Sequence, residues 1–512
     1  MNTFGDDVDP WGSRAATNEW AEEATTTTQY PTNEQTTPAT ITTGLNAVSL
    51  SGDGDLFNSK TDILEQRVWG EAPPDPTPNT VVPIIEPNIN QPQSGPTQGQ
   101  SHEQSSELDQ SELFGQWCDQ IRKSYNPLGP DIITIEEIPE REGLLFKHTN
   151  YSVKHLIELP GQDSAKDNCV VRRYSDFLWL QETLLRRYPF RMVPELPPKK
   201  LGSQIADKIF LEKRRKGLLR FINLVMKHPV FQKDDLVLTF LTVPTELSNW
   251  RKQASFDTSD EFIDKRIAAS FVKMWHKGIS EQWNNAASSI ERTMEIWSRI
   301  CILVERHERK LKQMAHEQSI FGSLVNDLSN LTPNLYPIEQ SDTVLDINNH
   351  FSIIKKHLNK TQDIAQDNAT KTCNSLLPKF KLFTDILLSL RGLFERYKIM
   401  ATNNIPQLQR HVVLNREKLE AMKGKPDANG VEYDRIKMSI TRDKKSISEQ
   451  LNRAWLVRKC ILEEFTIFQE TQFMLTRAFQ DWSKLNASFV GINLNEWEKL
   501  EEQLEDMPLG QN

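Results

Sequence analysis

The chain has 512 residues with a formal net charge of -9, of which 38% are hydrophobic and 26% charged, so it can form two or three soluble domains. No run of about 18 apolar residues occurs, which predicts no membrane-spanning helix, and the acidic start lacks the apolar core of a secretory signal. The five cysteines include no CxxC pair, so neither a disulfide framework nor a zinc site is expected.

The first part of the chain is acidic. Residues 1–120 hold 3 Lys+Arg and 19 Asp+Glu, a net of -16, so the remainder carries +7. Residues 1–110 are rich in Thr, Asn, Gln and Pro and show no apolar period, which predicts a disordered acidic arm. Two aromatic islands, Asp9–Trp11 and Leu56–Trp69, are either short docking motifs or stray aromatic residues of the arm.

A short amphipathic lead-in is expected at 111–128 and an α+β domain at 129–245. Strand patterns begin at Asp131, Tyr151 and Asn168, and a helical pattern covers 176–188. Prolines at 189, 194, 197 and 198 impose an extended loop, and two further helices are expected at about 205–228 and 233–243. The pattern predicts a small antiparallel sheet followed by helices.

The segment from Arg172 to Lys227 is strongly basic. It holds 14 Lys+Arg and 5 Asp+Glu, a net of +9. An Arg presents a fork of donors to phosphate oxygens, a Lys supplies a compact charge, and a Tyr offers a flat face to a sugar-like ring. The segment therefore suits a phosphorylated ligand, although a basic run can equally be a solvated helix face.

Three motifs in this segment carry a more specific indication. They are Arg172-Arg173-Tyr174-Ser175-Asp176-Phe177, the Leu196-Pro197-Pro198-Lys199 loop and the helix start Arg214 to Leu218. Together they resemble the phox-homology (PX) domain of sorting nexins. The resemblance implies that Arg173 holds the 3-phosphate of phosphatidylinositol 3-phosphate and that Tyr174 stacks under the inositol ring. It also implies that Lys199 contacts the 1-phosphate and Arg214 the free ring hydroxyls.

The proline-rich loop contains a second candidate membrane contact. Phe190, Met192 and Val193 lie beside Arg191 and the Lys199-Lys200 pair. Apolar side chains next to cations suit insertion into a headgroup layer. The alternative is that the three side chains pack under the loop.

The linker at 246–260 is open to two interpretations. Leu247, Trp250 and Phe256, together with Arg251 and Lys252, could form a short amphipathic segment lying on the membrane. Alternatively, the linker packs the α+β domain against the segment that follows.

An all-α domain is expected at 261–490, followed by a C-terminal tail at 491–512. Three long helical segments are predicted, at about 260–330, 341–422 and 431–487, with Pro378 and Pro406 bending the second. Their wide apolar stripes include Ile279, Trp283, Ile290, Met294, Trp297, Cys301 and Val304 in the first, and Leu451, Trp455, Leu462, Phe465, Phe468, Leu475, Phe479 and Trp482 in the third. Three helices of this length cannot bury such stripes alone, which predicts a homodimer.

The size, number and interrupted second helix resemble a BAR domain. With the upstream domain, the chain resembles PX–BAR sorting nexins, and three stretches, 136–147, 385–398 and 461–472, resemble the fungal Mvp-type sorting nexins, counterparts of animal sorting nexin eight. The resemblance implies a cytoplasmic protein, peripheral on endosomal membranes, that binds phosphatidylinositol 3-phosphate. It would shape membrane for cargo sorting, recycling and vacuolar protein sorting. Trafficking adaptors or retromer are candidate partners, and the assembly beyond a dimer stays open.

Other function classes have less support. No phosphate loop, zincin, serine-hydrolase or kinase motif occurs, so neither catalytic activity nor a cofactor is expected. Nucleic acid is disfavoured because aromatic residues do not interleave with the basic ones. A helical scaffold whose PX-like domain docks proteins rather than lipid remains the alternative.

Overall fold

The computed structural model describes residues 101–142, 148–159, 168–199, 208–337, 341–423 and 430–509. The acidic arm up to residue 100 and both aromatic islands lie outside the described residues. Helix α1 spans Ser101–Lys123, so it begins before the expected lead-in at 111, in a stretch that was expected to be disordered. In the part of the chain that the structure describes, no helix is long and apolar enough to cross a bilayer.

The first domain contains a three-stranded antiparallel sheet in the order β1-β2-β3. The strands are β1 (Ile133–Glu142), β2 (His148–His155) and β3 (Cys169–Arg173), which confirms the predicted strand patterns. Ile135 pairs with Val153, and Ser152 pairs with Val171. Side chains alternate between the two faces of a strand, so Ile133, Ile135 and Val153 are all buried on one face.

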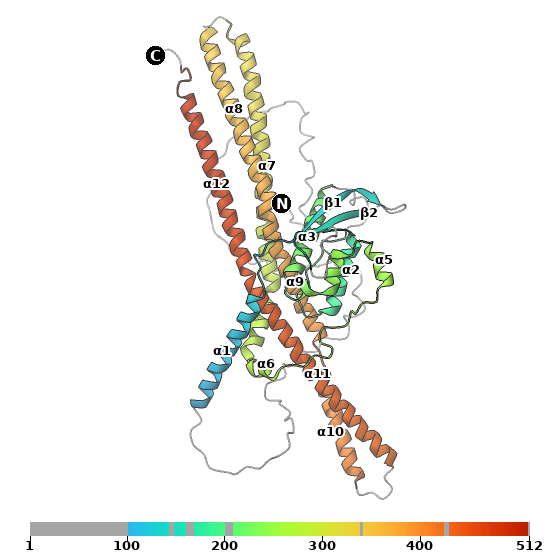
Figure 1. Ribbon diagram of the computed structural model, residues 1–512. Helices are drawn as coiled ribbons and strands as arrows, with labels where there is room; N and C mark the ends of the chain where they lie inside the picture. The colour runs from blue at the N-terminus through green and yellow to red at the C-terminus, as the bar shows by residue number, and fades with distance from the viewer. Residues whose placement is uncertain are drawn as a thin grey trace, which may run out of the picture. The chain divides into compact units, whose positions relative to one another are not determined.

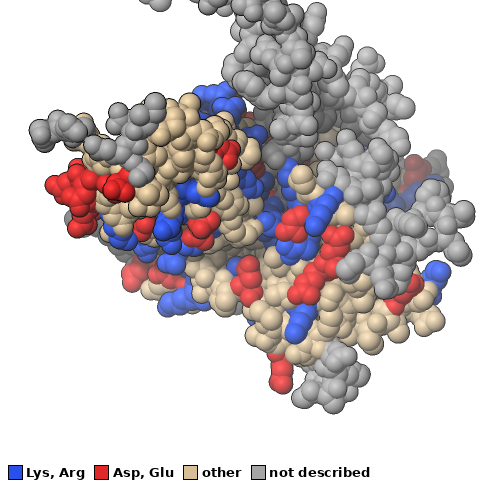
Figure 2. Space-filling view, turned by 90° about the horizontal axis from the view of Figure 1, so that it is seen from above, with Lys and Arg blue, Asp and Glu red and all other residues tan. Residues whose placement is uncertain are grey.

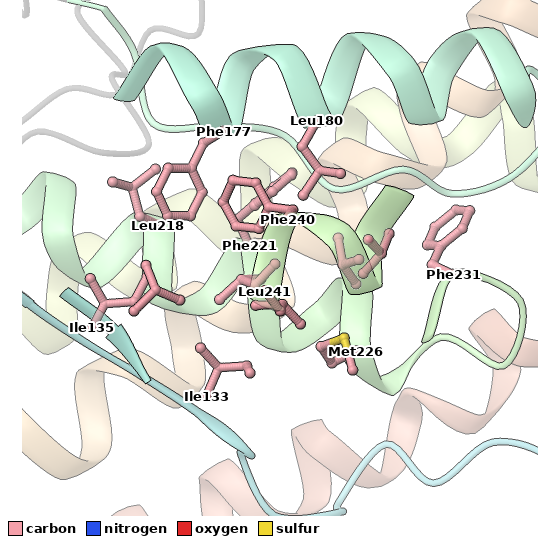
Figure 3. Close-up of a cluster of buried hydrophobic side chains, with 14 of the residues drawn as sticks. Ile133, Ile135, Phe177, Leu180, Leu218, Phe221, Met226, Phe231, Phe240 and Leu241 are labelled. Atoms are coloured by element: carbon pink, nitrogen blue, oxygen red, sulfur yellow. The ribbon is translucent and has the colours of Figure 1, made fainter. Parts of the chain in front are cut away.

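Three helices supply most of the rest of this domain's core. They are α2 (Tyr174–Arg187), α3 (Lys208–Lys227) and α4 (Asp235–Thr242), close to the predicted positions, with a 3-10 turn, η2 (Phe231–Lys233), before α4. Figure 3 shows Phe177 and Leu180 of α2 and Phe221 of α3 meeting Phe240 of α4, with β1 alongside. Asp234 caps α4 by accepting hydrogen bonds from the N–H groups of Leu236 and Val237.

The linker after α4 packs on this domain. Helix α5 (Leu247–Gln253) buries Leu247 in the domain core. The rings of Trp250 and Phe256 both contact the ring of Trp179 on α2, with centroid separations of 6.2 and 5.7 Å. These contacts favour the packing interpretation of the linker over a segment lying on the membrane.

The regular elements that the structure describes in the second domain are all helices. Its elements are α6 (Ala269–Met274), α7 (Lys277–Leu335), α8 (Ser341–Lys371), the π-helical turn η3 (Thr372–Leu376), α9 (Leu377–Met400), α10 (Ile405–Met422), α11 (Gly430–Glu470) and α12 (Gln472–Leu504). The first long helix begins at Lys277 rather than near 260. The second is interrupted next to both Pro378 and Pro406, where Pro removes a backbone donor. The third is divided at Thr471.

The long helices run alongside one another in two groups. Helix α8 packs against both α7 and α12, whereas α10 pairs with the first part of α11, as Figure 1 shows. Trp283, Trp297 and Val304 are buried as the apolar stripe of α7 predicts. Leu451, Phe479 and Trp482, expected on the buried face of the third helix, are instead exposed in the single chain.

Phe190, Met192 and Val193 are all buried, which contradicts their expected insertion into a membrane. The rings of Phe190 and Phe262 lie 5.9 Å apart between centroids, and Met192 belongs to the same apolar cluster as α9 and α11 residues. Val193 packs in the core of the first domain. Transfer to a headgroup layer would require these side chains to leave two packed cores, which favours the alternative, that they pack inside the protein.

Candidate headgroup-binding site

Arg173 is placed by the junction between a strand and a helix. It is the last residue of β3 and the N-cap of α2, with an extended backbone. Its backbone N–H donates to Asp176 Oδ2 at 3.0 Å, and its Nε lies 3.8 Å from Asp176 Oδ1. Asp176 is buried, whereas the Arg173 side chain is 34% exposed. The guanidinium is thus oriented from behind by a carboxylate and remains accessible to an anion.

Tyr174 connects three separate segments. As the first residue of α2, it follows Arg173 directly, and its hydroxyl donates to the Pro197 carbonyl at 2.7 Å. The guanidinium carbon of Arg214 lies 4.8 Å from the centroid of its ring. Burial raises the pKa of the Tyr174 hydroxyl, and the charge of Arg214 partly offsets this. The ring therefore ties the β3–α2 junction to the proline-rich loop and to α3.

Lys199 is exposed on the proline-rich loop, two residues beyond the Pro197 carbonyl that Tyr174 binds. Two consecutive prolines precede it and restrict the backbone there to extended conformations. The loop thus holds a cation two residues from the point where Tyr174 binds it.

Arg214 is the most buried of the four predicted contacts, with a relative exposure of 8%. It lies on α3, and its guanidinium also stacks on Phe210, one helical turn earlier, at 4.4 Å from the ring centroid. The structure therefore brings Arg173, Tyr174 and Arg214 together and places Lys199 on the adjoining loop. We call these four residues the headgroup site.

Arg172, the neighbour of Arg173, has a structural role. Its side chain is 1% exposed and points away from the site, as alternation along β3 requires. It donates from Nε to the Phe240 carbonyl at 2.8 Å and from Nη2 to the Val243 carbonyl, both at the end of α4. Burial lowers the pKa of Arg172 to about 10, and the guanidinium stabilises the negative end of the helix.

Several basic side chains of this segment form ion pairs within the chain. Arg187 pairs with Asp234 and Asp235, Arg215 with Glu212, and Lys227 with Asp131. On the face shown in Figure 2, basic and acidic side chains lie interspersed. The net charge of +9 therefore overstates how positive the surface of this segment is. The headgroup site is a smaller group of cations within the segment.

A group of ionic contacts between the two domains was not foreseen from the sequence. Arg191 Nη1 lies 3.0 Å from Glu464 Oε1 and its Nε lies 2.8 Å from Glu261 Oε1. His228 Nε2 is 3.1 Å from Glu464, whose Oε2 also accepts from the Met192 N–H at 2.9 Å. We call these contacts, with the second pair below, the domain seam.

The second pair of the seam joins α3 to α9. Arg220 Nε lies 2.6 Å from Asp385 Oδ2, and both side chains are buried. Lys216 on the same helix donates to Asn374 Oδ1 in the π-helical turn at 3.2 Å. Helix α3 thus carries Arg214 of the headgroup site and, within the next two turns, Lys216 and Arg220, which contact the helical domain. These contacts hold the site against the long helices.

Among the described residues, no group of three or more His, Cys, Asp or Glu side chains could hold a metal ion. The site consists of cations and aromatic rings rather than acid–base or nucleophilic groups. A basic α+β domain fixed on interrupted long helices defines a PX–BAR protein.

Comparison with known proteins gives the family. The PX domain model matches residues 161–244, and the Sorting nexin 8/Mvp1 BAR domain model matches residues 255–511. The chain is 55% identical to Sorting nexin MVP1 of Saccharomyces cerevisiae over 98% of both chains, and 59% identical to that of Candida glabrata over 78% of both. A solved structure, the cryo-EM structure of the SNX-BAR Mvp1 tetramer, is 66% identical with a TM-score of 0.65, covering 72% of this chain and 99% of that one.

The chain therefore belongs to the sorting nexin 8/Mvp1 family of PX–BAR sorting nexins. Its function is that of a membrane-shaping sorting nexin, and its PX domain implies a phosphoinositide ligand. The architecture predicted from the sequence, a PX domain followed by a BAR domain, is confirmed.

Proposed function

We propose that this sorting nexin recognises phosphatidylinositol 3-phosphate on endosomal membranes through the headgroup site. Arg173 would hold the 3-phosphate, Tyr174 would lie against the inositol ring, Lys199 would contact the 1-phosphate and Arg214 the ring hydroxyls. The observation that carries the proposal is the placement of Tyr174, which contacts both Arg214 and the loop of Lys199. A rigid frame of this kind orders cations around one ligand without a large entropic cost on binding.

Flotation of the purified full-length chain with vesicles tests this proposal. Vesicles should contain about 5% phosphatidylinositol 3-phosphate, unphosphorylated phosphatidylinositol or phosphatidylinositol 4-phosphate, matched in total charge with phosphatidylserine. We expect retention only with the 3-phosphate at moderate salt. Equal retention on all three would indicate nonspecific charge attraction. No retention on any would favour the alternative, a PX-like domain that docks proteins.

We further propose that the BAR domain assembles with a second copy of the chain. An apolar stripe on the second half of α7, formed by Phe321, Leu324, Leu328, Leu331 and Leu335, is exposed in the single chain. On α12, Val490, Leu494 and Trp497 are exposed as well. These positions recur at three- and four-residue steps, as an interface between helices requires. The Mvp1 relative forms a tetramer, which supports a homo-oligomer here.

The double substitution Phe321→Glu and Leu328→Glu is expected to convert the assembly to monomers. Each change would place a carboxylate in the proposed apolar interface, where it has no partner and must lose its hydration. Mass by light scattering at about 1–10 μM measures the result. The control is Ser319→Glu, which adds charge at an exposed polar position of the same helix outside the stripe. An unchanged mass for the double variant would place the assembly interface elsewhere.

A further inference from the structure

Arg214 contains a buried donor that has no acceptor. Among the described residues, nothing accepts a hydrogen bond from its Nε. The guanidinium plane is held by two rings, Tyr174 and Phe210, at 4.8 and 4.4 Å from their centroids. Rings hold a guanidinium against their faces but accept no conventional hydrogen bond from its edge. A buried unpaired N–H is costly, so it indicates a partner that forms in another state of the protein.

Tyr151 provides a hydroxyl that likewise has no well-formed hydrogen bond. It lies on β2, its side chain is fully buried, and no described group meets the geometry of a hydrogen bond to its hydroxyl, although the Arg214 side chain lies within reach of it. Its ring belongs to the same apolar cluster as Tyr174 and Leu218, under α3. Burial raises the pKa of Tyr151 to about 12, and the nearby charge of Arg214 opposes this rise. The hydroxyl is thus uncharged at neutral pH and lies close to Arg214.

The two orphaned groups are complementary. The Nε–H of Arg214 is a donor, and the phenolic oxygen of Tyr151 has lone pairs that can accept. They lie on elements packed against one another, since α3 packs on the sheet that contains β2. One hydrogen bond would satisfy both, and the Arg214 side chain already lies within reach of the Tyr151 hydroxyl.

We propose that Tyr151 is a positioning residue for Arg214, and that headgroup binding closes a hydrogen bond from Arg214 Nε–H to the Tyr151 hydroxyl. The inference rests on the proposed function, because it assigns the ligand of Arg214 to an inositol headgroup. With Nε held from behind, the two Nη groups present a fixed fork to neighbouring ring hydroxyls. Because the Tyr151 hydroxyl is neutral, it adds no charge to attract a further phosphate at these ring positions.

A double-mutant cycle tests the proposal. Tyr151→Phe keeps the ring and removes only the hydroxyl, and it is combined with Arg214→Gln. Binding is measured by calorimetry with short-chain phosphatidylinositol 3-phosphate and by flotation with vesicles containing the same headgroup. We expect Tyr151→Phe to weaken binding about 10- to 150-fold in both assays, the range for a hydrogen bond to a charged group. In the Arg214→Gln background the same change should have no further effect.

The control is Tyr125→Phe, which removes the hydroxyl of a partly buried Tyr packed against the helical domain. It should bind like the wild type, and thermal melts should show that all variants fold. Equal losses from Tyr151→Phe in both Arg214 backgrounds would overturn the proposal, because a general packing defect acts independently of Arg214. Wild-type affinity in the Tyr151→Phe variant would overturn it too, while leaving the proposed function intact. If the wild type itself ignores the lipid, the proposed function fails instead.

A loss limited to vesicles would also overturn the inference. It would mean that Tyr151 acts on contact with the bilayer rather than on the headgroup. Inorganic phosphate serves as a third probe, because it offers no ring hydroxyl. We expect its weak binding to be the same for the wild type and Tyr151→Phe, and an equal loss there would contradict a role through ring hydroxyls.

Discussion

Replacing Glu464 by Ala is expected to lower the free energy of unfolding by about 3–5 kcal/mol and to loosen the PX domain from the BAR domain. Glu464 has no exposed surface and lies on α11, where it meets Arg191, His228 and the Met192 N–H from the PX domain. Its removal leaves the buried guanidinium of Arg191 with less negative charge around it, because Glu261 and Glu463 remain but Glu464 does not. The change should appear as a lower thermal midpoint and as faster proteolysis between 254 and 268.

A neighbouring carboxylate provides the matched control. Glu463 lies 3.3 Å from Arg191 Nη2 but is 20% exposed and also pairs with Lys459. Because solvent screens an exposed pair, Glu463→Ala should cost no more than about 1 kcal/mol. Equal losses from the two variants would show that burial does not govern the strength of the seam.

The same carboxylate predicts an acid dependence. Burial raises the pKa of Glu464, but His228, Arg191 and the Met192 N–H outweigh it and lower the pKa to about 2. A lowered folded-state pKa means that the stabilisation is complete above the unfolded value of 4.5 and is lost as the pH falls through about 2. The stability difference between the wild type and Glu464→Ala should therefore shrink below pH 4.5 and stay constant from pH 5 to 7.

Asp385 titrates in the opposite sense. Burial raises its pKa to about 6, although Arg220 lies 2.6 Å away and lowers it. Burial has the larger effect on the pKa of Asp385, because the carboxyl is enclosed between α3 and α9. A raised folded-state pKa favours the protonated form, so this contribution is complete below pH 3.8 and is lost as the pH rises through about 6. The two pairs together should make the seam strongest at mildly acidic pH.

The candidate residues Arg173 and Tyr174 could be placed from the sequence because the signal is local. Arg173 and Tyr174 are adjacent, and a strand end followed by a helix is sufficient to place them. The prolines around Lys199 restrict their own backbone. Alternation along β3 could also have separated the buried Arg172 from Arg173, yet both appeared as parts of one basic motif.

The seam could not be predicted because its partners are distant in the chain. Arg191 and Glu464 are 273 residues apart, and the sequence around either residue gives no indication that the other is its partner. Seen alone, Phe190 and Met192 beside a cation fit a membrane wedge as well as a domain contact. Only the packing of α9 and α11 decides between the two. The division at Thr471 lacks a proline or glycine signal, whereas the interruptions at Pro378 and Pro406 carried one.

Replacing Arg173 by Ala should abolish recognition of phosphatidylinositol 3-phosphate while leaving the fold intact. The substitution removes the guanidinium that lies beside the buried Asp176 and that would bind the 3-phosphate. Its loss should cost about 2–4 kcal/mol of binding free energy. That corresponds to a loss of roughly 30- to 1,000-fold in headgroup affinity. The side chain is partly exposed and supports no packing in the PX core, so the thermal midpoint should change little.

Titration with short-chain lipid and flotation of the same sample measure this effect on the headgroup and on the membrane separately. Arg186→Ala is the matched control, since it removes an exposed Arg from α2, outside the site. It should reduce affinity by less than about threefold through general charge. If Arg173→Ala loses headgroup affinity but still floats, avidity from the assembled BAR helices exceeds the contribution of the PX site on membranes. If it keeps headgroup affinity as well, the 3-phosphate is held by residues other than Arg173.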